Sequence, residues 1–300
     1  MDPDIKIIFF VKKSQYLPNG KVVAILDQDF NRKSLPSNLE NSIEETWNSR
    51  IDTNPKLYNG TKFRLHSVSE ASDKTLTLNL GVTCYKEYLG TNWAPNSKLL
   101  HSFGKDVFKN EQACMSDPVG VGSFVITSDN HVILLRRSND CAESPGLWDC
   151  PGGHAEPEEL VGKKSFEEID LSSMTGEAVV KEIFDSIIRE IRDEVNIPEH
   201  CLSAPQLIGI ALNTTSACRP SIEFIVQCSK SSTEVVSLYK EGSQSEAEES
   251  TNIMTLPLND MVSLEESHRE IWDNMAPAGK GCIVLYRLAN GLYDISKLNQ

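Results

Sequence analysis

A glycine-rich turn followed by a carboxylate-rich amphipathic helix constrains this 300-residue chain more than any other stretch. The turn is Pro151-Gly152-Gly153-His154, and the helix is expected to end near Val195. At ~100° per residue, its apolar side chains fall within one arc of roughly 140°. They are Val180, Ile183, Phe184, Ile187, Ile188, Ile191 and Val195. This arc predicts a helix that packs on a hydrophobic core.

Three acidic residues, Glu190, Asp193 and Glu194, lie beside the apolar arc within about 100° of one another. Glu190 and Glu194 are a like-charge pair at i,i+4, which opposes helix formation by ~0.2 to 0.5 kcal/mol. One interpretation is a solvated helix face, which is where runs of charge commonly lie. The other is a divalent-cation site, because Mg²⁺ prefers oxygen ligands and is held by one or two carboxylates together with substrate phosphates.

The order of these residues resembles the Nudix box, written G-x5-E-x7-R-E-U-x-E-E-x-G-U with U aliphatic. Gly153 opens the box and Glu159 takes the place of its first glutamate. The second half is filled by Arg189, Glu190, Ile191, Asp193, Glu194 and Ile197. An insertion places Arg189 22 positions beyond residue 167, so we assign no function to Glu159 or Glu182.

Two substitutions also depart from the box pattern. Asp193 replaces a glutamate, which shortens a ligand arm without changing its charge. Asn196 replaces a glycine, and Asn tolerates the left-handed conformation that is common at helix C-termini. Both changes are therefore compatible with the site.

The resemblance implies an α/β fold, the Nudix α/β/α sandwich with a mixed sheet, over residues 117–300. Residues 1–116 would form a small N-terminal α+β domain that helps to hold the substrate. Motifs at 62–67, 85–93, 215–217 and 223–224 are similar to those of the UDP-sugar pyrophosphatases within the superfamily. They imply hydrolysis of UDP-glucose or UDP-galactose to UMP and a sugar 1-phosphate, with Mg²⁺ as cofactor and Mn²⁺ as a substitute.

The same resemblance implies the site residues. Metal ligands would be Glu190, Asp193 and Glu194. Catalytic roles would fall to Glu190, Glu194 and Glu223, with the general base open between Glu194 and Glu223. Arg189 would support the site by orienting the acids through ion pairs. The expected substrate contacts are Tyr58, Arg64, Tyr85, Thr91, Asn92, Asp149, Gly152, Gly153, Thr215, Ser216 and Lys280.

The stretch from Gly81 to Trp93 is dense in aromatic and small polar residues. It can be a capped turn with aromatic rings packed beneath it, or a nucleoside pocket in which Tyr85 stacks on the base and Asn92 binds its polar edge. Arg64 can bind a phosphate in bidentate fashion, with a structural ion pair as the alternative.

Local patterns also predict strands and loops outside the box. Residues 5–11 and 22–26 are apolar runs around Leu17-Pro18-Asn19-Gly20 and predict a hairpin. Residues 62–69 and 75–82 predict two further strands. The acidic, serine-rich stretch 241–252 predicts a mobile loop.

Composition excludes several classes of partner. With 29 Lys and Arg against 43 Asp and Glu, the net charge of −14 argues against binding to nucleic-acid phosphates. The run 5–11 is far shorter than the ~20 apolar residues that span a bilayer, so we expect no membrane partner. Eight cysteines without a C-x-x-C pair favour free thiols in the cytosol or the nucleus. No protein partner can be inferred.

Other functions compete with UDP-sugar hydrolysis. The chain can act on another nucleoside diphosphate derivative, such as ADP-ribose or coenzyme A. It can also be a catalytically silent Nudix module that binds a nucleotide, although such modules usually lose an acid and this chain retains three. A protein-interaction adaptor that uses the acidic stretch is the remaining alternative.

Overall fold

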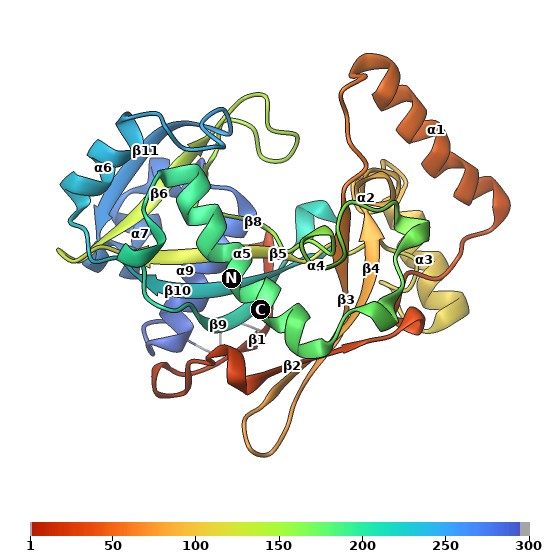
Figure 1. The fold of residues 1–300 in the computed structure, drawn as a ribbon, viewed down its shortest axis with the longest axis horizontal. Coiled ribbons are helices and arrows are strands. Elements are labelled where there is room, and N and C mark those ends of the chain that lie inside the picture. Colours follow the sequence, from red (N-terminus) through yellow and green to blue (C-terminus); the bar gives the residue numbers. More distant parts are fainter. Residues whose placement is uncertain (1, 295–300) are drawn as a thin grey trace.

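The computed structural model describes residues 2–294, which form two β-sheets lying side by side (Figure 1). The larger sheet has the order β1-β9-β10-β5-β6-β11, with β7 paired to β6 and β8 paired to β5. Only β10 and β5 run parallel among its described pairs, so the sheet is mixed. Its strands are β1 (Ile5–Phe10), β5 (Gly120–Ile126), β6 (His131–Arg137), β7 (Trp148–Asp149), β8 (Gly152–His154), β9 (Gln206–Asn213), β10 (Arg219–Gln227) and β11 (Ser250–Pro257).

Helices α5 (Gly176–Val195) and α9 (Pro277–Ala289) cover opposite faces of the large sheet. Along β10, Phe224 packs in the core beside α5 and the next residue, Ile225, packs in the core beside α9. Neighbouring side chains diverge in this way because successive residues of a strand point to opposite faces. The predicted α/β/α sandwich with a mixed sheet is confirmed.

The smaller sheet has the order β2-β4-β3 and belongs to the N-terminal part of the chain. Its strands are β2 (Val22–Leu26), β3 (Thr61–Glu70) and β4 (Leu76–Cys84), and the helices beside it are α1 (Ser37–Thr53), α2 (Tyr85–Gly90) and α3 (Ser97–Phe108). The predicted strands at 62–69 and 75–82 are confirmed as the antiparallel pair β3 and β4.

The predicted hairpin of residues 5–11 and 22–26 is wrong. β1 pairs with β9 in the large sheet, whereas β2 runs parallel to β4 in the small one. Leu17, at the expected turn, instead bridges to Leu207. These partners are distant in sequence, so local turn signals could not reveal them. The strand Ile5–Phe10 therefore lies outside the small sheet, although the sequence placed it in the N-terminal domain.

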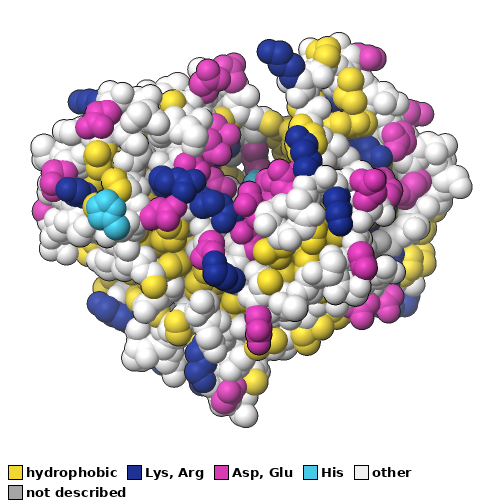
Figure 2. Space-filling model, viewed as in Figure 1, with side chains coloured by type: hydrophobic (Ala, Val, Ile, Leu, Met, Phe, Trp, Pro, Cys, Tyr) yellow, Lys and Arg dark blue, Asp and Glu magenta, His cyan; other side chains and the backbone are white. Residues whose placement is uncertain are grey.

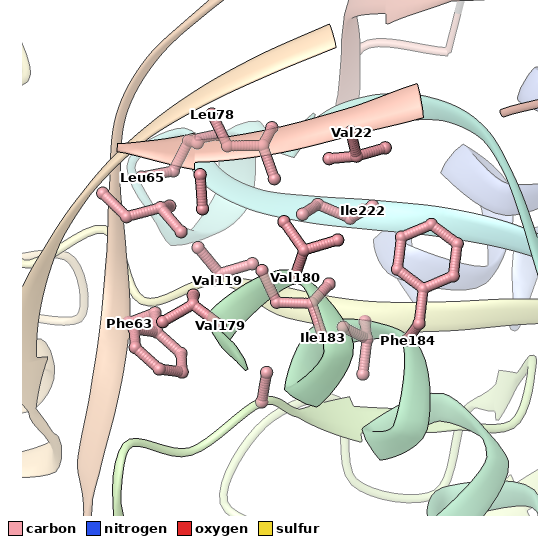
Figure 3. Close-up of a cluster of buried hydrophobic side chains, with 14 of the residues drawn as sticks. Val22, Phe63, Leu65, Leu78, Val119, Val179, Val180, Ile183, Phe184 and Ile222 are labelled. Carbon is pink, nitrogen blue, oxygen red and sulfur yellow. The ribbon is translucent and has the colours of Figure 1, made fainter. Parts of the chain in front are cut away.

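Helix α5 lies between the two sheets and shares a core with both (Figure 3). Its side chains Val179, Val180, Ile183 and Phe184 meet the small sheet at Val22, Phe63, Leu65 and Leu78, and the large-sheet half at Val119 and Ile222. Full burial of one such side chain contributes about 1.5 to 3 kcal/mol. The helix that carries the acids is thus fixed from two sides.

The ends of α5 follow the sequence closely. Thr175 caps its N-terminus by accepting the backbone N–H of Ala178, and Asn196 ends it in the left-handed conformation with φ 67°. The insertion before it adds Leu171 and Met174 to the shared core. The remaining helices are α4 (Glu158–Val161), α6 (Ser232–Lys240), α7 (Leu264–Ser267) and α8 (Arg269–Asp273). None of the described helices has the length and apolar character needed to cross a bilayer.

Candidate active site

Strand β8 carries the glycine turn against the acidic face of α5. The backbone N–H of Gly152 donates to Glu194 Oε2 at 2.9 Å, and that of His154 donates to Glu190 Oε1 at 3.0 Å. A Cβ on Gly153 would overlap the Glu190 carboxylate, and a Cβ on Gly152 would overlap the backbone of β5. The two glycines therefore allow the close approach of β8 to the carboxylates.

Glu194 is buried and Glu190 is half-buried, and the two carboxylates act on each other as like charges. Glu194 is 5% exposed, and burial together with the Glu190 charge raises its pKa well above the usual range. Burial and the charge of Glu246 likewise raise the pKa of Glu190. Such a pair is unfavourable unless a proton or a cation neutralises it. The two side chains therefore differ from a solvated helix face, and either a proton or a cation would relieve their repulsion.

Asp193, the third predicted metal ligand, is already neutralised. Both of its carboxylate oxygens accept from Arg192, at 2.8 and 2.7 Å, and this contact lowers its pKa. Within residues 2–294, no three His, Cys, Asp or Glu side chains are gathered closely enough to hold a metal ion. The predicted three-carboxylate set is therefore not assembled, and only its two glutamates face the turn.

Arg189 does not orient these acids as predicted. It forms an ion pair with Glu182 at 2.6 Å, and Glu182 also accepts the backbone N–H of Glu156 at 3.3 Å. This contact joins α5 to the chain that leaves β8. The predicted ion pairs to the acids are wrong, and Glu182, to which we assigned no function, is the partner of Arg189.

Two more carboxylates reach the site from the acidic stretch 241–252. The backbone N–H of Glu246 donates to the carbonyl of Asp193 at 3.0 Å, and the carbonyl of Glu249 accepts from Ser138 at 2.8 Å. These bonds tie a stretch that we predicted to be mobile to α5 and to the loop after β6. The charges of Glu246 and Glu249 both raise the pKa of Glu190, so the two side chains belong to the same acidic centre.

Two cavities meet beside this centre. The larger has a volume of about 450 Å³ and the smaller about 120 Å³. Both are lined by Arg137, Glu143, His154 and Glu249, so they form the two ends of one cleft. Figure 2 shows a hollow between the two halves of the molecule with acidic side chains around its rim.

The larger cavity is lined by aromatic rings from α2. Tyr85 and Tyr88 face it together with Lys62 and Pro118. The Tyr88 ring stacks on Trp93 with ring centroids 6.1 Å apart, which fixes its orientation. A wall of this kind, apolar with a few polar groups, suits a flat aromatic ligand.

The smaller cavity is lined mainly by charged and small polar groups, among them Asp149, Arg219 and Glu223. Glu223 is fully buried, and burial raises its pKa to about 7. Burial also raises the pKa of Asp149 to about 6, against the nearby charge of Arg137. These carboxyl groups can therefore change protonation near neutral pH.

Glu143 connects the walls of the two cavities. Its Oε1 accepts from Ser216 Oγ at 2.8 Å and from Asn213 Nδ2 at 2.9 Å. Its Oε2 accepts from the Tyr88 hydroxyl at 3.1 Å and pairs with Arg219 at 3.2 Å. Burial opposes ionisation, yet the Arg219 charge and these hydrogen bonds hold the pKa of Glu143 below its usual value.

Several named proteins align with most of this chain, although no family model matches it. A Bos taurus protein named uridine diphosphate glucose pyrophosphatase NUDT22 is 42% identical over 295 residues, 97% of this chain and 99% of its own length. The Homo sapiens protein of that name is 40% identical over 97% of this chain and 95% of its own length. Nudix hydrolase 9 of Arabidopsis thaliana is 36% identical over 74% of this chain and 73% of its own length. The chain belongs to the Nudix hydrolase family.

Solved Nudix structures are more distant in sequence. A Nudix hydrolase from Nitrosomonas europaea is 15% identical and covers 57% of this chain and 89% of its own, with a TM-score of 0.35. A Nudix hydrolase from Alicyclobacillus acidocaldarius is 14% identical over 61% of this chain and 95% of its own, also with a TM-score of 0.35.

Three substrate contacts predicted in the N-terminal part of this Nudix hydrolase lie outside both cavities. Arg64 is 1% exposed and lies 3.5 Å from Asp117. Its guanidinium donates to three backbone carbonyls, those of Phe30, Gln112 and Met115. Asn92 donates to Asp117 at 2.8 Å, and the Thr91 hydroxyl donates to a backbone carbonyl of its own helix. These groups bond to the protein itself, which favours a structural role over the substrate role predicted for them.

Four further predicted contacts are engaged elsewhere. Lys280 forms ion pairs at 3.0 and 3.1 Å with two aspartates of the N-terminal segment. Tyr58 is 46% exposed and donates to a surface glutamate. Thr215 donates to an asparagine of its own loop, and Ser216 donates to Glu143. None of the four lines either cavity, and their roles toward a ligand stay predictions.

Five other predicted residues line the two cavities, whereas Glu190, Asp193 and Glu194 line neither of them. Tyr85 lines the larger cavity, and Asp149, Gly152, Gly153 and Glu223 line the smaller one. Their roles toward a ligand stay predictions.

The sequence did not single out Arg137, Glu143, His154, Arg219 or Glu249, all of which line the cleft. Arg137 ends β6 and Arg219 begins β10. Isolated basic residues at strand ends carry no local signal, and it is sheet pairing that brings them together. Only Glu249 had a signal, because it belongs to the acidic stretch.

Proposed function

We propose that this protein is a UDP-sugar diphosphatase that hydrolyses UDP-glucose or UDP-galactose to UMP and a sugar 1-phosphate. The named relatives support the substrate class. The observation that carries the proposal is the cleft itself, in which an aromatic cavity and a polar cavity meet beside the acidic centre. A substrate with a nucleoside at one end, a sugar at the other and a diphosphate between them matches this order.

Glu190 and Glu194 would hold a divalent cation, Mg²⁺ with Mn²⁺ as a substitute. The fit rests on two like charges, one buried and one half-buried, beside the further acids Glu246 and Glu249. Burial and these acids together outweigh the more favourable charges of Lys62 and Arg137. Asp193 would bind the cation through a water molecule, or directly after its hydrogen bonds to Arg192 break. When bound, the cation supplies charge neutralisation of the diphosphate and lowers the pKa of the attacking water.

The general base in this proposal is Glu249. The two candidates from the sequence were Glu194 and Glu223, and Glu194 is taken up by the cation site. Glu249 lines both cavities and its charge acts on Glu190 and Glu194, so it lies where the diphosphate would meet water. It would accept the proton of the water as the oxygen attacks phosphorus.

The side chain of Arg137 would orient the diphosphate, because it lines both cavities. Guanidinium groups donate to phosphate oxygens in bidentate fashion. In the larger cavity Tyr85 and Tyr88 would stack on the uracil ring, a contact worth ~1 to 3 kcal/mol per base.

We place the reaction in the cytosol or the nucleus. The eight cysteines are all free in the structure, and unpaired thiols are typical of reducing compartments.

The test is incubation of the purified protein with MgCl₂ and, separately, UDP-glucose, UDP-galactose, ADP-ribose and coenzyme A, with products followed by phosphorus NMR. We expect UMP and sugar 1-phosphate from the UDP-sugars, and no turnover when EDTA replaces the cation. Faster hydrolysis of ADP-ribose or coenzyme A than of the UDP-sugars would contradict the proposal and make that compound the substrate. Turnover of no compound by a folded protein would favour the silent binding module.

A further inference from the structure

We infer that the smaller cavity is the glycosyl subsite of this hydrolase, in which Glu223 and Arg219 bind the hydroxyl groups of the sugar. The inference rests on the function proposed above and names the part of the substrate that this cavity recognises. It also gives Glu223 a role in substrate specificity in place of the general-base role that the sequence suggested.

Glu223 and Arg219 are buried with unused hydrogen-bonding capacity. Glu223 is fully buried, and neither carboxylate oxygen has a partner with full hydrogen-bond geometry within the described chain, although Ser221 and Cys282 lie near enough to oppose the rise that burial causes in its pKa. Arg219 is 6% exposed, and its Nε–H is likewise without a partner there. Most buried polar groups in folded proteins have partners, and leaving one unpaired costs about 1 to 3 kcal/mol. Two such groups lining one cavity indicate that a ligand completes their bonds.

The large-sheet backbone makes room for these side chains. A Cβ at Gly122 would overlap the Glu223 carboxylate, and a Cβ at Gly120 would lie 2.7 Å from the Arg219 guanidinium. Both glycines belong to β5, which pairs with β10, the strand that carries Glu223 and Arg219. The unpartnered groups are thus held by paired strands and are not flexible surface side chains.

The chemistry of the lining favours a polyol over a phosphate or an apolar group. Each sugar hydroxyl donates one hydrogen bond and accepts others, which matches the carboxylates of Glu223 and Asp149 as acceptors and the Arg219 Nε–H as donor. Arg137 and Arg219, which also line the cavity, already pair with Asp149 and Glu143. An ionised Glu223 would therefore repel a phosphate placed beside it. The volume of about 120 Å³ is roughly that of four liquid waters, so a compact polar group fits.

Glu223 and Glu249 differ in which cavities they line. Glu223 lines only the smaller cavity, whereas Glu249 lines both and its charge acts on Glu190 and Glu194. A general base must lie within hydrogen-bond reach of the attacking water. Glu249 meets this requirement better, which leaves Glu223 for the group beyond the diphosphate.

The decisive experiment compares two substrates that share the UDP diphosphate. One is UDP-glucose, and the other is the methyl ester of UDP, in which a methyl group replaces the glucosyl group. For Glu223→Gln we expect kcat/KM to fall ~10- to 100-fold with UDP-glucose and to stay within about twofold of wild type with the methyl ester. Glu223→Asp serves if the amide variant melts below the assay temperature.

Glu182→Gln is the matched control, because Glu182 is also a buried glutamate but lines neither cavity. We expect any change in this variant to be equal for the two substrates. An equal loss with both substrates in Glu223→Gln would mean that Glu223 acts on water or the diphosphate, and would overturn the inference. Unchanged kinetics with both would overturn it too.

Failure of the proposed function looks different, since the wild-type protein would then split neither compound. The subsite is still tested in that case by calorimetric titration of wild type and Glu223→Gln with glucose 1-phosphate and with inorganic phosphate. We expect wild type to bind glucose 1-phosphate more tightly than inorganic phosphate, and Glu223→Gln to lose this preference. Equal binding of the two anions, or equal binding by the two proteins, would overturn the inference.

Discussion

Two clusters of buried polar side chains lie within this molecule, and they differ in how their bonds are satisfied. The first joins the two halves through Arg64, Asn92 and Asp117. The second lines the cleft and includes Glu194 and Glu223. All five residues are at most 5% exposed, so burial alone does not separate them.

The two clusters differ in whether their hydrogen bonds are satisfied within the protein. Arg64 donates to three backbone carbonyls, and Asn92 both donates to Asp117 and accepts its backbone N–H at 3.0 Å. In the cleft, neither carboxylate oxygen of Glu223 has a partner with full hydrogen-bond geometry among residues 2–294, although Ser221 and Cys282 lie near it. Glu194 is buried beside another carboxylate. A buried group with its bonds complete stabilises the fold, whereas one without them marks a place where a ligand, cation or proton binds.

The largest expected effect is on the first cluster. Arg64→Ala removes a buried guanidinium and leaves three carbonyls without donors, so the free energy of unfolding should fall by about 3 to 5 kcal/mol. KM for UDP-glucose should not change at a temperature where the variant is folded. Urea denaturation and steady-state kinetics measure the two effects.

Arg269→Ala is the matched control, because Arg269 pairs with Asp273 on the surface with its side chain 80% exposed. Its loss should cost no more than about 1 kcal/mol. A tenfold rise in KM with unchanged stability in Arg64→Ala would instead place Arg64 at the substrate and remove the distinction between the clusters.

For the cleft we expect a loss of activity without a loss of stability. Glu194→Gln should lower kcat/KM by a hundredfold or more, which corresponds to about 2.7 kcal/mol, because a cation ligand is lost. The free energy of unfolding should stay the same or rise, since the substitution removes a buried like charge next to Glu190. Glu199→Gln, on the surface beyond the end of α5, should leave the rate within about twofold. A cleft variant that loses stability and keeps its rate would make Glu194 a structural residue.

Sequence alone identified the part of the site that is local in the chain. The turn at Gly152 and Gly153 and the acids on α5 lie within one unit whose period of 3.6 residues is visible in the sequence. The left-handed cap at Asn196 was also predicted and is confirmed. The fold class followed from the resemblance that this unit carries.

The sequence could not distinguish the first cluster, Arg64, Asn92 and Asp117, from the cleft. We call this cluster the joint. Arg64 and Glu223 are both single charged residues within apolar strands, and their difference depends on what lies opposite them. The partners of Arg64 extend from Phe30 to Asp117. The cavity around Glu223 needs the pairing of β5 with β10. The strand β1 was misplaced for the same reason, because its partner β9 is about 200 residues away and no local pattern encodes the pairing.

A smaller effect is expected at the far end of the cleft, where the aromatic wall meets the nucleoside. Tyr85→Ala should raise KM for UDP-glucose by the equivalent of ~1 to 3 kcal/mol with kcat nearly unchanged, because stacking is lost in the ground state and the transition state alike. Tyr85→Phe keeps the ring and should behave like wild type. If both variants kept the wild-type KM, Tyr85 would belong with the structural cluster.

The smallest expected effect is a dependence of stability on pH that arises in the joint. Burial raises the pKa of Asp117 to about 7, although Arg64 lies beside it and Asn92 donates to it. The unfolded chain releases this proton near pH ~3.9. Between these values the folded protein binds the proton and the unfolded chain does not, so the free energy of unfolding falls as pH rises, by at most about 1.4 kcal/mol per pH unit.

Asp117→Asn isolates this contribution, because the amide does not titrate, keeps an acceptor for Asn92 and tolerates the φ of 44° at this position. Groups that titrate elsewhere act equally on both proteins and cancel in the difference between their urea denaturation curves, measured at about pH 5, 6 and 7. We expect wild type to lose stability relative to the variant across this range. A constant difference would mean that Arg64 keeps Asp117 ionised throughout. Arg64 and Asp117 would then form a permanent buried ion pair. In that case the joint would differ from the cleft only in the completeness of its hydrogen bonds and not in neutralisation by a proton.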